Sequence, residues 1–323
     1  MTRSDRRRAD EAVAAGLDAA PEPERADEAP AKGGSSGFRR IAADFSENWL
    51  AVGALALVIV ILFLATFAPW VTPQNPYDLA HLSILDGRLP PGSQSMTGMT
   101  YLMGTDSQGR DMLSAIIYGI RTSLIVAVFA GSMALMVGMT MGLIAAYFGG
   151  RIDALIMRIV DLMLGFPTIL SALIILVILG KGTDKVILAL IVVQWAYYAR
   201  TARSAALVER NKEYVEAARG LGASGMRILF RHILPNCLPP IIVVGTVQVA
   251  HAIALEATLS FLGIGLPITE PSLGLLIANG FKYLLSGMYW ISVFPGVALV
   301  LTVVSINLVS DQLREVLNPR TQR

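Results

Sequence analysis

The chain has 323 residues, of which 54% are hydrophobic and 15% are charged, and its formal net charge is +2. Soluble domains usually contain about a quarter charged residues, so this composition excludes an ordinary soluble protein and indicates an all-α integral membrane protein. The single cysteine, Cys237, excludes an internal disulfide, and no spacing of Cys and His suggests a metal site. Nothing in the charge pattern favours a nucleic-acid partner.

Residues 1–45 are predicted to form a disordered tail. Arg, Asp and Glu are mixed there with Ala, Pro and Gly, so few large apolar side chains are available for burial. The basic run Arg6-Arg7-Arg8 lies far from the first apolar stretch, which argues against a cleavable signal peptide.

The first membrane span is expected within residues 46–70. No charged residue occurs from Leu50 to Ala68, and Trp49 and Trp70 flank this stretch as interfacial aromatic residues do. Residues 71–115 follow as a polar connection, rich in Pro and Gly, that is too long for a tight turn. We expect this connection to lie on the extracytoplasmic side.

Residues 116–310 are predicted to form a five-helix core, which brings the total to six transmembrane helices. The five spans are expected at about residues 123–148, 154–179, 186–207, 238–262 and 290–309. A shorter apolar stretch at 273–285 is interrupted by Gly280 and Lys282, so we interpret it as a re-entrant or surface helix. Basic residues gather in alternate connections, and this bias places both termini, including residues 311–323, in the cytoplasm.

Gly138 and Gly142 are separated by three residues in the second predicted span. Such a pair permits close contact between helices in a membrane bundle. Glycine is also common in membrane helices without any such contact, so the sequence leaves both interpretations open.

Residues 209–236 form a charged, helix-forming insert between apolar spans. A first helix is followed by a glycine-rich turn, and Ser224 is expected to cap a second helix that Pro235 ends. The apolar face of the first helix consists of Tyr214, Val215, Ala218 and Leu221. The apolar stripe of the second consists of Met226, Leu229, Phe230 and Ile233. One interpretation of this amphipathic hairpin is that it merely rests on lipid head groups.

The sequence contains no phosphate-binding loop and no hydrolase motif, so we expect no catalytic activity from this chain. Arg158 and Asp161 lie three residues apart and are expected to form a structural ion pair. His251 and Glu256 lie deeper in a span, where they either form part of a substrate path or gate, or make packing contacts. An ion-coupled secondary transporter would use Asp161, His251 and Glu256 for coupling, and a membrane scaffold without transport is a third possibility.

Glu216-Ala217-Ala218, followed after three residues by Gly222 and later by Leu234-Pro235, resembles the EAA signature of the membrane subunits of ABC-type importers. Two further stretches are similar to the C-type permeases of the dipeptide, oligopeptide and nickel branch. They are Gly104-Thr105-Asp106 through Gly109-Arg110-Asp111, and EATLSFLGIG at residues 256–265. The resemblance covers most of the chain after Asn48. Leu273 and Asn318 depart from it, because Trp and Asp are common at those positions.

This resemblance implies a type I ABC importer permease fold and ATP-driven import of di- or oligopeptides, with nickel or another small solute as alternative cargo. The implied partners are a homologous second permease, two cytoplasmic ATPase subunits that hold ATP and Mg²⁺, an extracytoplasmic peptide-binding protein and membrane lipid. No cofactor is expected on this chain itself. The residues expected to couple it to the ATPases are Glu213, Glu216, Ala217, Ala218, Gly222, Met226, Leu229 and Phe230.

Overall fold

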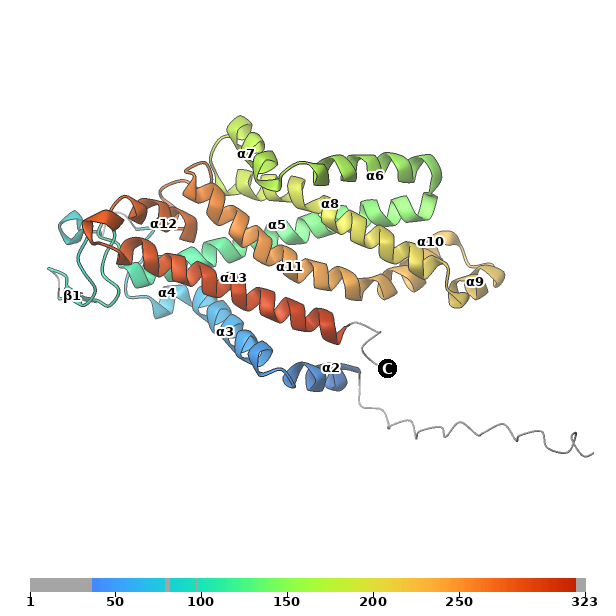
Figure 1. The fold of residues 1–323 in the computed structure, drawn as a ribbon, viewed down its shortest axis with the longest axis horizontal. Helices are drawn as coiled ribbons and strands as arrows, with labels where there is room; N and C mark the ends of the chain where they lie inside the picture. Colours follow the sequence, from blue (N-terminus) through green and yellow to red (C-terminus); the bar gives the residue numbers. More distant parts are fainter. Residues whose placement is uncertain (1–36, 79–81, 97, 318–323) are drawn as a thin grey trace, which may run out of the picture. The chain divides into compact units, whose positions relative to one another are not determined.

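The computed structural model describes residues 37–78, 82–96 and 98–317 (Figure 1). The chain divides into two units, Met1–Ala42 and Ala43–Arg323. Residues 1–36 of the predicted disordered tail lie outside the described residues. The remainder of that tail is helical, because α2 (Gly37–Ser46) has apolar residues at helical spacing, namely Phe38, Ile41, Ala42 and Phe45.

The unit Ala43–Arg323 is built almost entirely of helices (Figure 1). The long ones are α3 (Trp49–Thr66), α5 (Met112–Phe148), α6 (Gly150–Gly165), α7 (Thr168–Leu179), α8 (Thr183–Arg210), α11 (Leu234–Phe261) and α13 (Trp290–Val316). The short ones are α4 (Ala68–Val71), η2 (Ile84–Asp86), α9 (Glu213–Gly220), α10 (Gly225–Ile228), η3 (Leu229–Ile233), α12 (Leu273–Phe281) and η4 (Leu284–Ser286). Strands β1 (Ser93–Gln94) and β2 (Thr100–Tyr101) form a small antiparallel pair.

Four helical segments in the described residues are long and apolar enough to cross a membrane: α3, α5, the continuous stretch Gly225–Phe261, and α13. Helices α6 and α7 form a bent pair, and they are a fifth span if the two helices cross the membrane together. Helix α8 has the necessary length, but Gln194, Arg200 and Arg203 lower its apolar character. The predicted number of six spans is therefore not reproduced in full.

The span predicted at 154–179 is not one straight helix. Helices α6 and α7 meet at an angle of 93°, with the break at Phe166 and Pro167. Phe166 is extended, with φ −90° and ψ 143°, because the residue before a proline is disfavoured in the helical region.

The end predicted at Pro235 is also wrong. The π-helical turn η3 leads directly into α11, and the Leu234 N–H donates to the carbonyl of Leu229, five residues back. Pro235 lies in the first turn of α11, where a missing N–H costs least. The wider π turn lets the helix continue past the proline.

Helices α5 and α8 pack closely at Gly138 and Gly142, so close helix contact is the one observed of the two interpretations that the sequence leaves open. A Cβ atom on Gly138 would lie 2.3 Å from the Trp195 carbonyl oxygen, and one on Gly142 would lie 2.4 Å from that of Ala199. The main apolar core then joins these two helices to α3, α7, α11, α12 and α13.

The segment between α4 and α5 is a folded cap. Asp86 is buried and accepts hydrogen bonds from the hydroxyls of Ser95 (2.7 Å) and Tyr101 (3.2 Å). Trp290 at the start of α13 donates to the Thr105 carbonyl at 3.2 Å. Helix α5 begins at Met112, earlier than predicted, since Asp111 caps it by accepting from the Ser114 N–H at 2.8 Å.

The short apolar stretch predicted at 273–285 contains α12 and η4. Most of α12 is buried, so it is not a surface helix. Its glycines lie against neighbouring backbones: a Cβ on Gly274 would come within 2.0 Å of the Ala257 carbonyl oxygen, and one on Gly280 within 2.5 Å of the Ile291 backbone.

Candidate functional site

Residues 209–236, called here the 209–236 hairpin, join α8 to α11 through α9, a turn, α10 and η3. The turn closes α9 with two backbone bonds, from the Ala223 N–H to the Ala218 carbonyl (3.1 Å) and from the Gly222 N–H to the Arg219 carbonyl (2.9 Å). This is the Schellman pattern, which needs a left-handed residue just beyond the helix. Gly222 supplies it with φ +75°. Ser224 occupies the N-cap position of α10 but makes no side-chain capping bond.

The inner face of the hairpin is buried against the bundle. Its buried side chains pack with Leu143 and Ala146 of α5 and with Ala202 and Ala206 of α8. The hairpin residues in this cluster are Val215, Ala218, Ile228, Leu229 and Ile233. Leu229 is only 6% exposed and packs in this cluster, so it does not lie on the free surface of the hairpin. Its role in coupling stays a prediction.

The opposite face of the hairpin presents apolar side chains to its surroundings. Leu221 is 88% exposed, Met226 55% and Phe230 56%. Glu213, Glu216 and Ala217 are exposed as well, whereas Ala218 is buried. Helical periodicity assigned Leu221 to the inner face, but this residue follows the last turn of α9, where the helical spacing no longer applies. Gly222, which follows Leu221 directly, was the sequence signal that the helix ends there.

A polar network closes the base of the hairpin. The Tyr214 hydroxyl donates to Glu209 at 2.5 Å and accepts from the Asn236 side chain at 3.2 Å. Lys212 donates to the second carboxylate oxygen of Glu209 at 2.6 Å. Burial, with a smaller contribution from Glu209, raises the pKa of Tyr214 to about 12, so the tyrosine keeps its proton at physiological pH. Sequence reasoning missed this network, because its members lie up to 27 positions apart.

Glu256 and His251 do not form a common site. Glu256 is fully buried in α11 and accepts from Ser260 at 2.7 Å and from Ser123 of α5 at 2.6 Å. His251 is exposed on the same helix. The structure therefore gives Glu256 a satisfied contact between two helices, while His251 remains accessible.

The predicted ion pair between Arg158 and Asp161 is wrong. Asp161 pairs instead with Arg200 of α8, and Asp153 pairs with Arg203, with one contact at 2.6 Å. Two ion pairs thus fasten α6 to α8. An arginine on a neighbouring helix reached the carboxylate more readily than Arg158, which lies on the same helix as Asp161.

Within the described residues, no three His, Cys, Asp or Glu side chains are placed to hold a metal ion. Asp161, His251 and Glu256, the residues that ion coupling would use, have separate environments. The fold defines the class of a helical membrane protein, and the exposed apolar tip of the hairpin is the kind of surface that marks a site of interaction.

Comparisons with known proteins identify this class. Residues 138–323 match the family described as binding-protein-dependent transport system inner membrane component. Residues 36–91 match the N-terminal TM domain of oligopeptide transport permease C. This chain belongs to the family of binding-protein-dependent inner-membrane transport components, and it is a permease subunit, not an enzyme.

Relatives span most of the chain. The di/tripeptide transport system permease protein DppC of Pseudomonas aeruginosa is 38% identical over 85% of this chain and 90% of its own. The dipeptide transport system permease protein DppC of Escherichia coli K12 is 41% identical over 86% of this chain and 92% of its own. An inward-facing structure of the MetNI methionine ABC transporter matches with a TM-score of 0.53 at 22% identity, covering 64% of this chain and 98% of that one. The fold is that of a type I ABC importer permease.

Proposed function

We propose that this chain is one half of the membrane pathway of an ATP-driven importer of di- or oligopeptides. A homologous second permease supplies the other half, two cytoplasmic ATPase subunits hold ATP and Mg²⁺, and an extracytoplasmic binding protein delivers the peptide. The family membership and the names of the relatives, which are di- and tripeptide permeases, support this assignment.

The observation that carries the proposal is the two-sided 209–236 hairpin. Its inner face is part of the apolar core that includes α5 and α8, while Leu221, Met226 and Phe230 are exposed on the outer face. Burying one such side chain against a partner contributes about 1.5 to 3 kcal/mol. A partner that binds the exposed tip and changes its position therefore moves the attached spans as well, so the hairpin acts as a lever.

The other predicted coupling residues fit this lever in distinct ways. Glu213 and Glu216 are exposed and make no side-chain bond within the described chain, so their carboxylates are available to the ATPase. Ala217 leaves room for close approach, Ala218 anchors the inner face, and Gly222 forms the turn. The excess of basic residues in alternate connections supports a cytoplasmic location for the hairpin and both termini, where ATP is available.

Glu256 accepts hydrogen bonds from Ser123 and Ser260, and we assign it to holding α11 and α5 in register. His251 is the accessible member of the predicted pair and is the one we assign to the path. Nickel or another small solute remains the alternative cargo for the same mechanism.

The test is co-purification of the ATPase subunits with the tagged chain. Leu221→Asp places a charge in the exposed apolar tip, and Glu216→Lys reverses a charge beside it. We expect both changes to release the ATPases. The matched control is Leu285→Asp, because Leu285 is also fully exposed but lies outside the hairpin, in η4.

The control variant should retain the ATPases at the wild-type level. If Leu221→Asp, Glu216→Lys and the control all retain the ATPase subunits equally, docking of the ATPases at the hairpin is contradicted. A size-exclusion profile of each variant separates loss of docking from loss of folding.

A further inference from the structure

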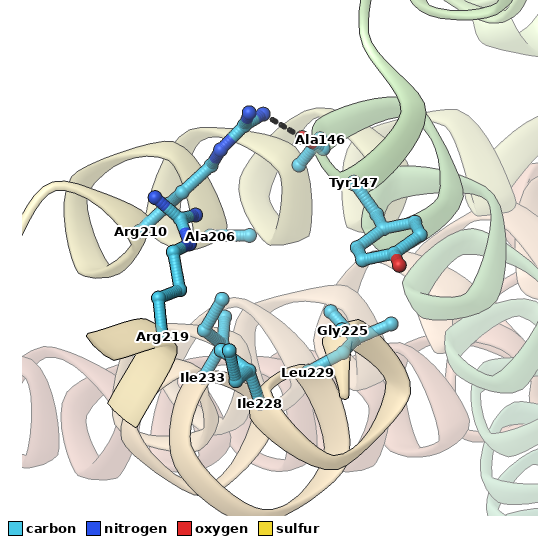
Figure 2. Close-up of a pocket in the computed structure, with 9 residues that line it drawn as sticks. All are labelled: Ala146, Tyr147, Ala206, Arg210, Arg219, Gly225, Ile228, Leu229 and Ile233. Atoms are coloured by element: carbon cyan, nitrogen blue, oxygen red, sulfur yellow. Dashed lines mark hydrogen bonds between the residues drawn. The ribbon is translucent and has the colours of Figure 1, made fainter. Parts of the chain in front are cut away.

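A cavity of about 70 Å³ lies where the 209–236 hairpin meets the ends of α5 and α8 (Figure 2). Its apolar wall includes Ala206, Ile228 and Leu229. Two arginines line the same cavity, Arg210 from α8 and Arg219 from α9, and Tyr147 faces the hairpin from α5. The cavity is therefore apolar on one side and cationic on the other.

The two cationic groups have no acidic counterpart in the cavity, since no Asp or Glu lines it. Arg210 donates one hydrogen bond, to the Ala146 carbonyl at 2.9 Å. Arg219 makes no side-chain hydrogen bond or ion pair in the part of the chain that the structure describes, although Glu216 is one helical turn away. Glu209 is engaged by Lys212 and Tyr214. Arg219 is exposed, so solvent screens part of the repulsion between the two charges, and an anion bound in the cavity would relieve it further.

We propose that this cavity binds a phosphate group, supplied by an anionic phospholipid. Guanidinium groups bind phosphate oxygens in bidentate fashion. Tyr147 lines the same cavity from α5, with its hydroxyl against Gly225. A phosphate diester needs a cationic pocket for its head and an apolar surface for the glycerol and the first methylenes. Both are present where α5, a candidate membrane span, and the long helix α8 end.

The position of the cavity favours lipid over an acidic side chain of a docked protein. The cavity lies on the inner side of the hairpin, among residues of the buried cluster that includes Ile228, Leu229 and Ile233. The surface offered to a partner protein contains Leu221, Met226 and Phe230, and none of these lines the cavity. Bound lipid would stabilise the contact between the hairpin and the ends of α5 and α8, through which the hairpin moves the spans. That consequence rests on the proposed function, whereas the binding itself does not.

The experiment measures retention of phosphatidylglycerol by the full-length chain in its purified complex, using native mass spectrometry after titration with phosphatidylglycerol or phosphatidylcholine. Arg219→Gln removes one guanidinium whose loss breaks no contact within the chain. We expect phosphatidylglycerol to bind about tenfold more weakly to this variant, as for the loss of one charge-assisted contact. Arg219→Lys, which keeps the charge, should give an intermediate affinity.

The matched control is Arg151→Gln, because Arg151 is exposed at the start of α6 and does not line the cavity. It should bind phosphatidylglycerol as the wild type does. A parallel titration with inorganic phosphate distinguishes the two sources: displacement of the lipid only at large excess supports the headgroup, and displacement at equal concentration identifies a free-phosphate site and overturns the lipid assignment.

One result would contradict the proposal outright, namely equal retention of phosphatidylglycerol by Arg219→Gln and the wild type. If Arg219→Gln also loses the ATPase subunits, Arg219 is assigned to a protein carboxylate. Because lipid retention is measured without ATP or peptide, a failure of peptide import would leave this result standing.

Discussion

Three glycines near the hairpin turn meet different physical demands. Gly222 has φ +75° and open space around it, so its requirement is conformational. Gly225 lies against the Tyr147 hydroxyl, to which an added Cβ would approach within 2.0 Å, so its requirement is close packing. Gly220 has neither a positive φ nor a close neighbour. The sequence shows three similar glycines, and only the structure separates their roles.

Gly222→Val is expected to loosen the turn. A left-handed residue with a Cβ costs about 1 to 2 kcal/mol, and a β-branched side chain is strained further. The backbone amides at position 222 and at Ala223 should exchange hydrogen faster than in the wild type. Peptide uptake should be lost, while insertion of the chain into the membrane stays intact. Gly220→Val is the matched control and should change neither quantity. Normal uptake by Gly222→Val would contradict the lever.

At the scale of elements, α5 is held to its neighbours by two unlike contacts. Gly138 and Gly142 let α8 approach its backbone, and Ser123 donates to the buried Glu256 of α11. The glycine contacts set the distance between α5 and α8. The carboxylate contact sets the register of α5 against α11. Two ion pairs then fasten α6 to α8.

Gly142→Ala should destabilise the bundle by about 1 to 3 kcal/mol, the usual cost of overpacking, because the new methyl group meets the Ala199 backbone. The control is Gly53→Ala in α3, where an added Cβ meets nothing within 4 Å. Thermal unfolding of the purified chain measures both. A melting temperature for Gly142→Ala equal to that of Gly53→Ala would show that α5 and α8 do not pack as described.

Sequence patterns predicted some elements well and others poorly, for identifiable reasons. The charge-free run before Trp70 located α3 to within two residues, because a lipid-exposed span must be continuously apolar. Pro167 broke a predicted span, and the restriction on the residue before it was readable in advance. Pro235 broke nothing, because a π turn accommodated it. The same proline rule therefore holds at Pro167, where the sequence analysis did not apply it, and fails at Pro235, where the sequence analysis did.

The candidate site shows the same limit. The Gly222 turn and the exposure of Met226 and Phe230 agree with the sequence analysis. The apolar stripe through Met226, Leu229 and Phe230 is divided in the fold, because tertiary packing selected Ile228, Leu229 and Ile233 for the inner face. Periodicity finds the apolar residues of a short helix, but not which of them the rest of the molecule covers.

At the scale of the whole molecule, the buried cluster under the hairpin and the core of the spans share α5 and α8. In the proposed function, a displacement of the hairpin is transmitted along two of the longest helices. We propose that a separate ATPase drives this displacement through the exposed tip.

The most direct measurement is uptake of a labelled dipeptide by proteoliposomes that contain the complete complex, with the binding protein outside and ATP inside. We expect uptake that requires ATP, that persists when a protonophore abolishes the ion gradient, and that Leu221→Asp abolishes. Uptake driven by an ion gradient without ATP, and unaffected by Leu221→Asp, would contradict the account.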